Sequence, residues 1–104
     1  MKFHIDVAAP ADKGRDIDAA GGPGPIVAEL MQRFQPEVMY GSADRRTLTF
    51  VADLATDVDI AVLMEICSDR LYAYPTLRPV VAIADLQEFV TIVHERVGQP
   101  LAAS

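Results

Sequence analysis

The sequence predicts an α+β domain with the ferredoxin-like order βαββαβ and one extra helix at its C-terminal end. Residues 2–7 alternate polar and apolar side chains, as a strand with one buried face does. Residues 25–35 and 57–71 carry apolar side chains at helical spacing, and segments typical of strands follow each of them. Because a chain of 104 residues holds one core, we assign residues 1–98 to a single domain and residues 99–104 to a frayed tail.

The first half of the chain supplies a strand, a loop, a helix and a hairpin. Residues 8–24 contain several glycines and prolines without hydrophobic periodicity, which predicts a long flexible loop that is mobile or acts as a lid. Pro25 suits the first turn of a helix, and Pro36 ends that helix. Residues 37–40 and 46–53 then form two strands of a hairpin.

The second amphipathic helix, residues 57–71, begins at a capping box formed by Thr56 and Asp59. Cys67 lies on its apolar stripe, so we interpret this cysteine as a small core residue rather than a nucleophile. The stripe consists of Ile60, Leu63, Met64, Cys67 and Leu71.

The last strand and the extra helix follow. Residues 76–84 are rich in Val and Ile, and Pro79 favours an edge position for this strand. Asp85 is predicted to cap the final helix with Glu88 at its third position, and Gly98 to end it.

Right-handed crossovers would place both helices of the βαββαβ unit on one face of an antiparallel sheet with strand order 4-1-3-2. Strict alternation then divides the strand residues between the two faces. The side facing the helices would hold Phe3, Ile5, Val7, Leu48, Phe50, Ala52, Leu77, Val81 and Ile83. The uncovered side would hold His4, Asp6, Thr47, Thr49, Val51, Arg78, Val80 and Ala82, with Met39, or Tyr40 if the short strand shifts by one residue.

The polar residues of the uncovered face are the candidate site. His4 and Asp6 would form a catalytic acid-base pair, because they lie two residues apart on one strand and His can exchange a proton near neutral pH. Arg78 would anchor a carboxylate or enolate. The other expected ligand contacts are Thr49, Tyr40 and Met39. In the alternative interpretation an Asp6–Arg78 ion pair fixes the register of a dimer interface, and His4 is a hydrogen-bonded neighbour.

Composition excludes several functions. Nine Lys and Arg against fifteen Asp and Glu give a net charge of −6, which would repel nucleic acid and anionic lipid. No apolar run approaches the roughly 18 residues of a membrane helix, and Asp6 interrupts any signal core, so we expect a cytoplasmic protein. With a single cysteine, and with His94 remote from His4 and expected at the surface of the final helix, we expect no metal and no cofactor.

Three short strings resemble a bacterial family of small proteins, the domain of unknown function numbered 3303: Met1-Lys2-Phe3-His4, Leu48-Thr49-Phe50-Val51-Ala52-Asp53 and Thr76-Leu77-Arg78-Pro79-Val80-Val81. The resemblance spans most of residues 1–90 and departs from the family at residues 8–24 and 41–44. It implies a member of the dimeric α+β barrel superfamily, a homodimer whose sheets pack face to face around a lumen. That superfamily includes isomerases, cofactor-free monooxygenases and haem-degrading enzymes.

From these observations we expect a homodimer that binds a small organic acid in the lumen between its sheets, with isomerisation or another proton transfer beside a carbonyl as the expected reaction. One alternative is a stress or accessory protein that binds a metabolite without transforming it, and another is a dimerisation or interaction module without enzymatic activity. In the second case Val51, Val80 and Met39 would fill the lumen. The sequence favours none of the three strongly, because a fold does not by itself choose a reaction.

Overall fold

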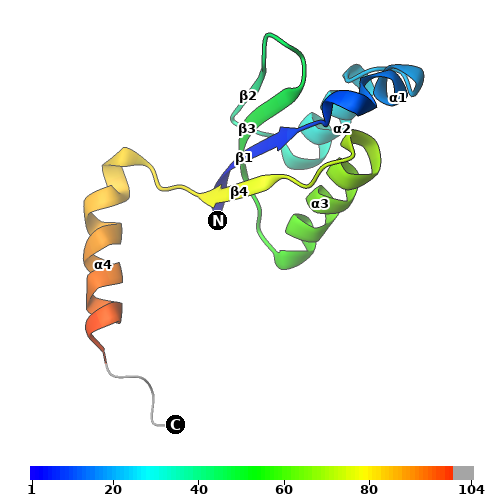
Figure 1. Cartoon of the computed structure of the whole chain (residues 1–104). Coiled ribbons are helices and arrows are strands. Elements are labelled where there is room, and N and C mark those ends of the chain that lie inside the picture. The colour runs from blue at the N-terminus through cyan, green and yellow to red at the C-terminus, as the bar shows by residue number, and fades with distance from the viewer. Residues whose placement is uncertain (100–104) are drawn as a thin grey trace.

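The computed structural model of the chain describes residues 1–99 and consists of a four-stranded sheet with helices (Figure 1). The predicted tail, 99–104, lies from residue 100 onward outside the described residues. No helix within residues 1–99 is long and apolar enough to cross a membrane. The elements are β1 (Lys2–Ala8), η1 (Ala11–Lys13), α1 (Gly14–Ala19), α2 (Gly24–Phe34), β2 (Val38–Gly41), β3 (Thr47–Asp53), α3 (Asp57–Leu71), β4 (Thr76–Pro79), η2 (Ile83–Asp85) and α4 (Leu86–Gly98).

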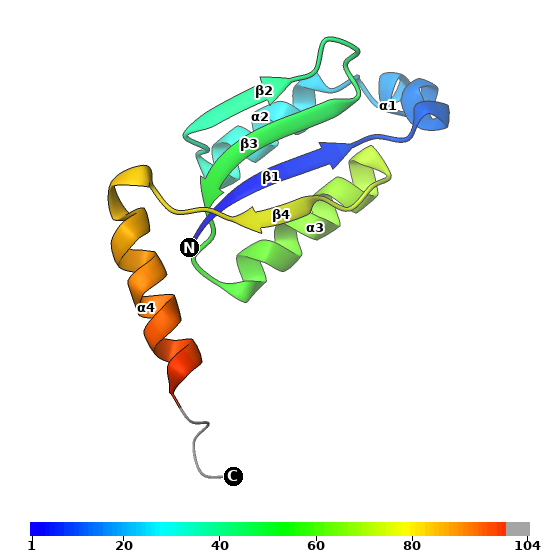
Figure 2. The same cartoon turned by 60° about the vertical axis from the view of Figure 1, so that its left-hand side comes forward.

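The sheet is antiparallel and open, with the order β2-β3-β1-β4, which reads β4-β1-β3-β2 from its other edge. β1 and β3 are the central strands, and Ile5 lies opposite Phe50 in their shared register. The helices α2 and α3 lie behind the same face of the sheet (Figure 2). One face is therefore covered by helices, and the opposite face, which we call the open face, is not.

The core lies between the sheet and these two helices. Alternation along β1 buries Phe3, Ile5 and Val7, because every second side chain of a strand points to the same face. β3 contributes Phe50 and Ala52 in the same way. The helices complete the core with Ile26 and Leu30 from α2 and with Leu63, Cys67 and Leu71 from α3.

The helix ends follow local rules. The predicted capping box of α3 is confirmed: Asp59 N–H donates to Thr56 Oγ1, and Thr56 N–H donates to an Asp59 carboxylate oxygen, each at 3.2 Å. The bounds of this helix, 57–71, match the prediction. α2 ends at Gln35, whose positive φ of 45° turns the chain just before Pro36.

The prediction that residues 8–24 lack regular structure is wrong. They form the turn η1 and the helix α1, and the side chain of Ile17 is buried in the core. Their glycines act at the end of α1, where Gly21 and Gly22 have positive φ and the Gly22 N–H donates to the carbonyl of Ile17 at 2.9 Å. One buried side chain anchors this short helix, which is too little apolar content to give a visible period.

The prediction of a last strand over residues 76–84 is also wrong in its second half. β4 ends at Pro79, and the Val80 N–H makes one further bond to the Lys2 carbonyl at 3.0 Å. Lys2 is the first residue of β1, so the partner strand has no residue left to pair with the chain beyond Val80. Ile83 belongs to the turn η2 and is 84% exposed, so neither it nor Val81 lies in the sheet facing the helices. Val80 and Ala82 likewise fall beyond the strand.

Helix α4 stands away from the rest of the chain (Figures 1 and 2). The predicted cap is absent, since the Asp85 side chain makes no capping hydrogen bond. The described chain measures 55 × 34 × 24 Å with a radius of gyration of 17.1 Å, whereas a compact chain of this length has about 13 Å. The position of α4, away from the sheet, therefore accounts for the elongated shape of the chain.

Candidate functional site

The open face carries its polar residues in two neighbouring rows. In one row His4 lies between Val51 of β3 and Arg78 of β4. In the next row Asp6 lies between Thr49 and Thr76. Because β1 is a central strand, His4 and Asp6 occupy the middle of the face. The expected gathering of His4, Asp6, Thr49 and Arg78 on one face therefore agrees with the register.

Three of these side chains are in direct contact. The Thr49 hydroxyl donates to Asp6 Oδ1 at 2.6 Å, and His4 Nδ1 lies 3.5 Å from Asp6 Oδ2. The side chains of His4 and Asp6 are 32% and 41% exposed, so solvent or a ligand can reach both. The carboxylate thus accepts a hydrogen bond from Thr49 on one oxygen, and its other oxygen lies beside the imidazole.

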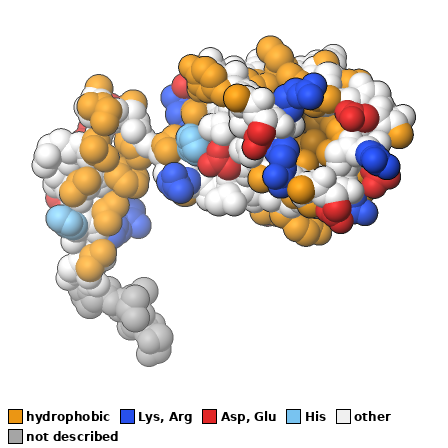
Figure 3. Space-filling model, turned by 45° about the horizontal axis from the view of Figure 1, so that its top comes forward, with side chains coloured by type: hydrophobic (Ala, Val, Ile, Leu, Met, Phe, Trp, Pro, Cys, Tyr) orange, Lys and Arg blue, Asp and Glu red, His pale blue; other side chains and the backbone are white. Residues whose placement is uncertain are grey.

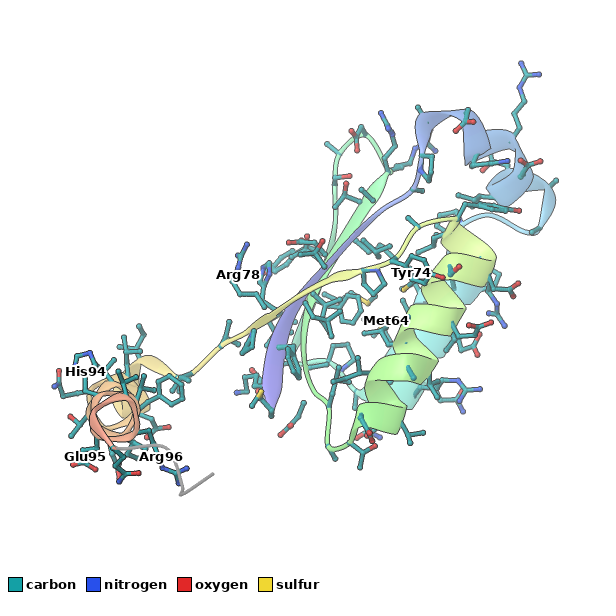
Figure 4. The ribbon with its side chains drawn as sticks, turned by 60° about the horizontal axis from the view of Figure 1, so that its bottom comes forward. Met64, Tyr74, Arg78, His94, Glu95 and Arg96 are labelled. Atoms are coloured by element: carbon teal, nitrogen blue, oxygen red, sulfur yellow. The ribbon has the colours of Figure 1, made fainter. Side chains whose placement is uncertain are left out.

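Arg78 points to the side of β4 away from α3 (Figure 4). Within residues 1–99 no carboxylate oxygen lies within 4.0 Å of its guanidinium, so the alternative Asp6–Arg78 ion pair does not form in the single chain. Arg78 is exposed, one strand away from His4. A cation without a partner on this face leaves its five N–H donors available.

The structure separates the two residues expected from the short strand. Tyr40 pairs with Thr49 and lies on the open face, where it is 66% exposed. Met39 pairs with Phe50 and packs against the core. The expectation that Met39 contributes to the open-face site is therefore wrong, because the pairing of β2 with β3 turns it toward the helices. Val38, opposite Val51, takes the open position instead.

The rim of the open face near the start of β1 is charged. Lys2 lies opposite Asp53 in the register and forms an ion pair with Glu37. The hydrogen bond and the charge of Glu37 raise the pKa of Lys2 above its ordinary value. Lys2 is therefore paired and offers less to a ligand than Arg78 does.

The remaining titratable candidates lie elsewhere. Cys67 is fully buried in the core, as predicted. His94 is exposed on α4, far from the sheet (Figure 4). Within the part of the chain that the structure describes, no group of three His, Cys, Asp or Glu side chains is arranged to hold a metal ion.

Sequence reasoning missed the most exposed apolar surface of the chain. Every residue of α4 is exposed, and hydrophobic side chains gather along this helix (Figure 3). The signal was present in the helical spacing of residues 86–97, but periodicity alone does not say whether a stripe has a partner. We call Leu86, Phe89, Val90, Val93 and Val97 the α4 stripe.

Comparison of the chain with protein-family models, curated proteins and solved structures found no match.

Proposed function

We propose that this chain works as a homodimer in which the open face and the α4 stripe bury against a second copy. A two-fold interface uses the same surface on both partners, so a chain with two neighbouring uncovered surfaces is suited to pair with itself. The stripe residues expose between 36% and 79% of their surface. Covering each of them contributes about 1 kcal/mol or more before the cost of association.

The βαββαβ order and the single covered face fit a ferredoxin-like fold. Two such sheets facing each other would give the dimeric α+β barrel that the sequence resemblance implies. In that arrangement α4 reaches beyond its own sheet toward the second copy. The elongated shape of the single chain supports this proposal, because an apolar helix held in water is unfavourable.

We further propose that the centre of the open face binds a small organic acid. The observation that carries this proposal is the row in which the unpaired Arg78 guanidinium lies next to His4. A guanidinium binds a carboxylate or enolate through two parallel hydrogen bonds. His4, which lies beside Asp6, would move a proton at a carbon beside the bound carbonyl, which is the chemistry of an isomerase.

One observation favours a second function, a packed interface without a ligand. Val38 and Val51 stand beside His4 in the same row, and both are at least partly exposed. In a close dimer these side chains would fill the space between the sheets. Arg78 would then pair with a carboxylate of the second copy.

The dimer is tested by adjacent substitutions on α4. Val90→Glu places a charge in the α4 stripe, whereas Thr91→Glu places the same charge one residue along, outside the stripe. Sedimentation should give about twice the chain mass for wild type and Thr91→Glu, and the chain mass for Val90→Glu. A folded wild-type monomer at micromolar concentration would contradict the proposal.

The acid site is tested by calorimetric titration of benzoate and of its neutral match, benzamide. Benzoate should bind the wild-type dimer, benzamide should not, and Arg78→Gln should weaken benzoate binding at least tenfold without dissociating the dimer. Arg15→Gln, on the exposed side of α1, is the matched control and should bind normally. If no carboxylate binds, and Arg78→Gln yields monomers, the packed interface is the function.

A further inference from the structure

A cavity of about 230 Å³ lies away from the open face, at the end of the core. It is enclosed by the start of α1, the end of α3 and the turn between β2 and β3. Val7, Ile17 and Leu71 form part of its wall and are otherwise almost fully buried. The core therefore stops short of this end and leaves an apolar space that its own side chains do not fill.

Two arginine residues line this cavity. Arg45 and Arg46 both belong to its lining, and within residues 1–99 no carboxylate oxygen lies within 4.0 Å of either of them. Arg45 also lines a neighbouring cavity of about 330 Å³, and Pro23 and Leu48 belong to both cavities. An apolar hollow with two cations at one wall is thus placed on the helix side of the sheet.

Two acidic residues, Asp18 and Asp44, also belong to the lining, so its two cations are matched by two anions. Asp44 is held within its own turn, because its carboxylate accepts from the Ser42 hydroxyl and from the Arg46 N–H. These bonds keep the pKa of Asp44 below its ordinary value. Asp18, on α1, is the remaining anion, and it faces a lining with two arginines.

Several hydrogen bonds hold the backbone of this turn. The Arg45 N–H donates to the Ser42 carbonyl at 2.9 Å, and the Thr47 N–H donates to the Ser42 hydroxyl at 3.0 Å. Arg45 adopts a positive φ of 61°, an unusual conformation for a side chain of this size.

We propose that this cavity is a second ligand site, which binds an amphipathic carboxylate with its hydrocarbon chain against Val7, Ile17 and Leu71 and its carboxylate on Arg45 and Arg46. Small-molecule sites are mostly apolar with a few convergent polar groups and usually measure about 300–1,000 Å³. The cavity of about 230 Å³ is smaller than this range, and the neighbouring cavity of about 330 Å³ lies at its lower end. A short-chain or medium-chain fatty acid has the matching chemistry. The proposal does not depend on the open-face site.

The test is a titration of the full-length protein with octanoate and with 1-octanol, which has the same chain without the charge. Octanoate should bind wild type at least tenfold more tightly than 1-octanol, because the alcohol makes no ion pair with the guanidinium groups. Arg45→Gln combined with Arg46→Gln should remove this difference. Arg15→Gln and Arg78→Gln should preserve it, and benzoate bound at the open face should not compete with octanoate.

A second variant examines the hollow itself. Gly14 belongs to the lining, has ordinary helical dihedral angles, and an added Cβ there meets no atom within 4 Å. Gly14→Leu should therefore fold normally and weaken binding of both octanoate and octanol by occupying the space. Absence of octanoate binding to wild type would overturn the inference. Loss of octanoate binding in Arg78→Gln, with normal binding in the Arg45/Arg46 variant, would place the ligand on the open face and overturn it while leaving the proposed function standing.

Discussion

Among single residues, Cys67 is the one whose chemistry is changed most by its position. Its side chain is fully buried between α3 and the sheet, and this burial raises the pKa of the thiol from 9.0 to about 11. A thiol reacts only as the thiolate. Cys67 is therefore a core residue that should resist alkylation while the chain stays folded.

The raised pKa of Cys67 predicts a loss of stability at alkaline pH. Between pH 9 and about pH 11 the unfolded chain has released this proton and the folded chain has not, so raising the pH favours unfolding. The contribution is fully present below pH 9 and amounts to about 2 to 3 kcal/mol lost by pH 11. Urea unfolding across this range should show a steeper fall for wild type than for Cys67→Ala, and equal slopes would contradict the burial argument.

Single residues also show how far the candidate site was predictable. His4 and Asp6 were placed correctly because β1 alternates over its whole length, and a period of two leaves only one choice of face. Met39 was misplaced because β2 has four residues and no alternation of its own, so the pairing with β3 determines its register. The cavity beside Arg45 was not predictable, since it depends on how three separate elements meet.

Among the helices and strands, α3 is the one whose start is determined most clearly by neighbouring residues of its own sequence. Its capping box satisfies two N–H groups that the first helical turn leaves without partners. Thr56→Ala should lower the free energy of unfolding by about 1 kcal/mol in urea titrations, whereas Thr56→Ser retains a hydroxyl and should stay close to wild type. Equal stability of the alanine and serine variants would show that the cap contributes nothing.

Two parts of the fold escaped prediction from the sequence, each for its own reason. α1 is six residues long with a single buried side chain, Ile17, and a pattern needs at least two turns of apolar residues to be visible. The second half of the expected last strand has the composition of a strand, yet its partner β1 begins at Lys2 and offers no residue to pair with it. Residues 80–84 therefore have side chains typical of a strand, but they lack the backbone pairing that would make them one.

At the scale of the whole molecule, the sheet and its two helices form a core that the single chain completes by itself, but α4 does not join it. Sequence predicted this helix and its end at Gly98. It did not predict the position of the helix, because an apolar stripe packs equally well on its own chain or on another. Whether α4 packs against anything therefore depends on the binding of a second chain.

If the homodimer completes the fold, thermal stability must depend on protein concentration. A partner that binds only the folded chain shifts unfolding by mass action, so the Tm of wild type should rise as concentration increases from about 1 to about 100 μM. Val90→Glu should have a lower Tm without this dependence, because burying its charge would prevent the α4 stripe from pairing with a second copy, while Thr91→Glu should behave as wild type does. A wild-type Tm that stays constant across this range, in a protein that sediments as a monomer, would mean that α4 serves a different partner. The open face would then be exposed to solvent, and Arg78 would remain available to a ligand in the single chain.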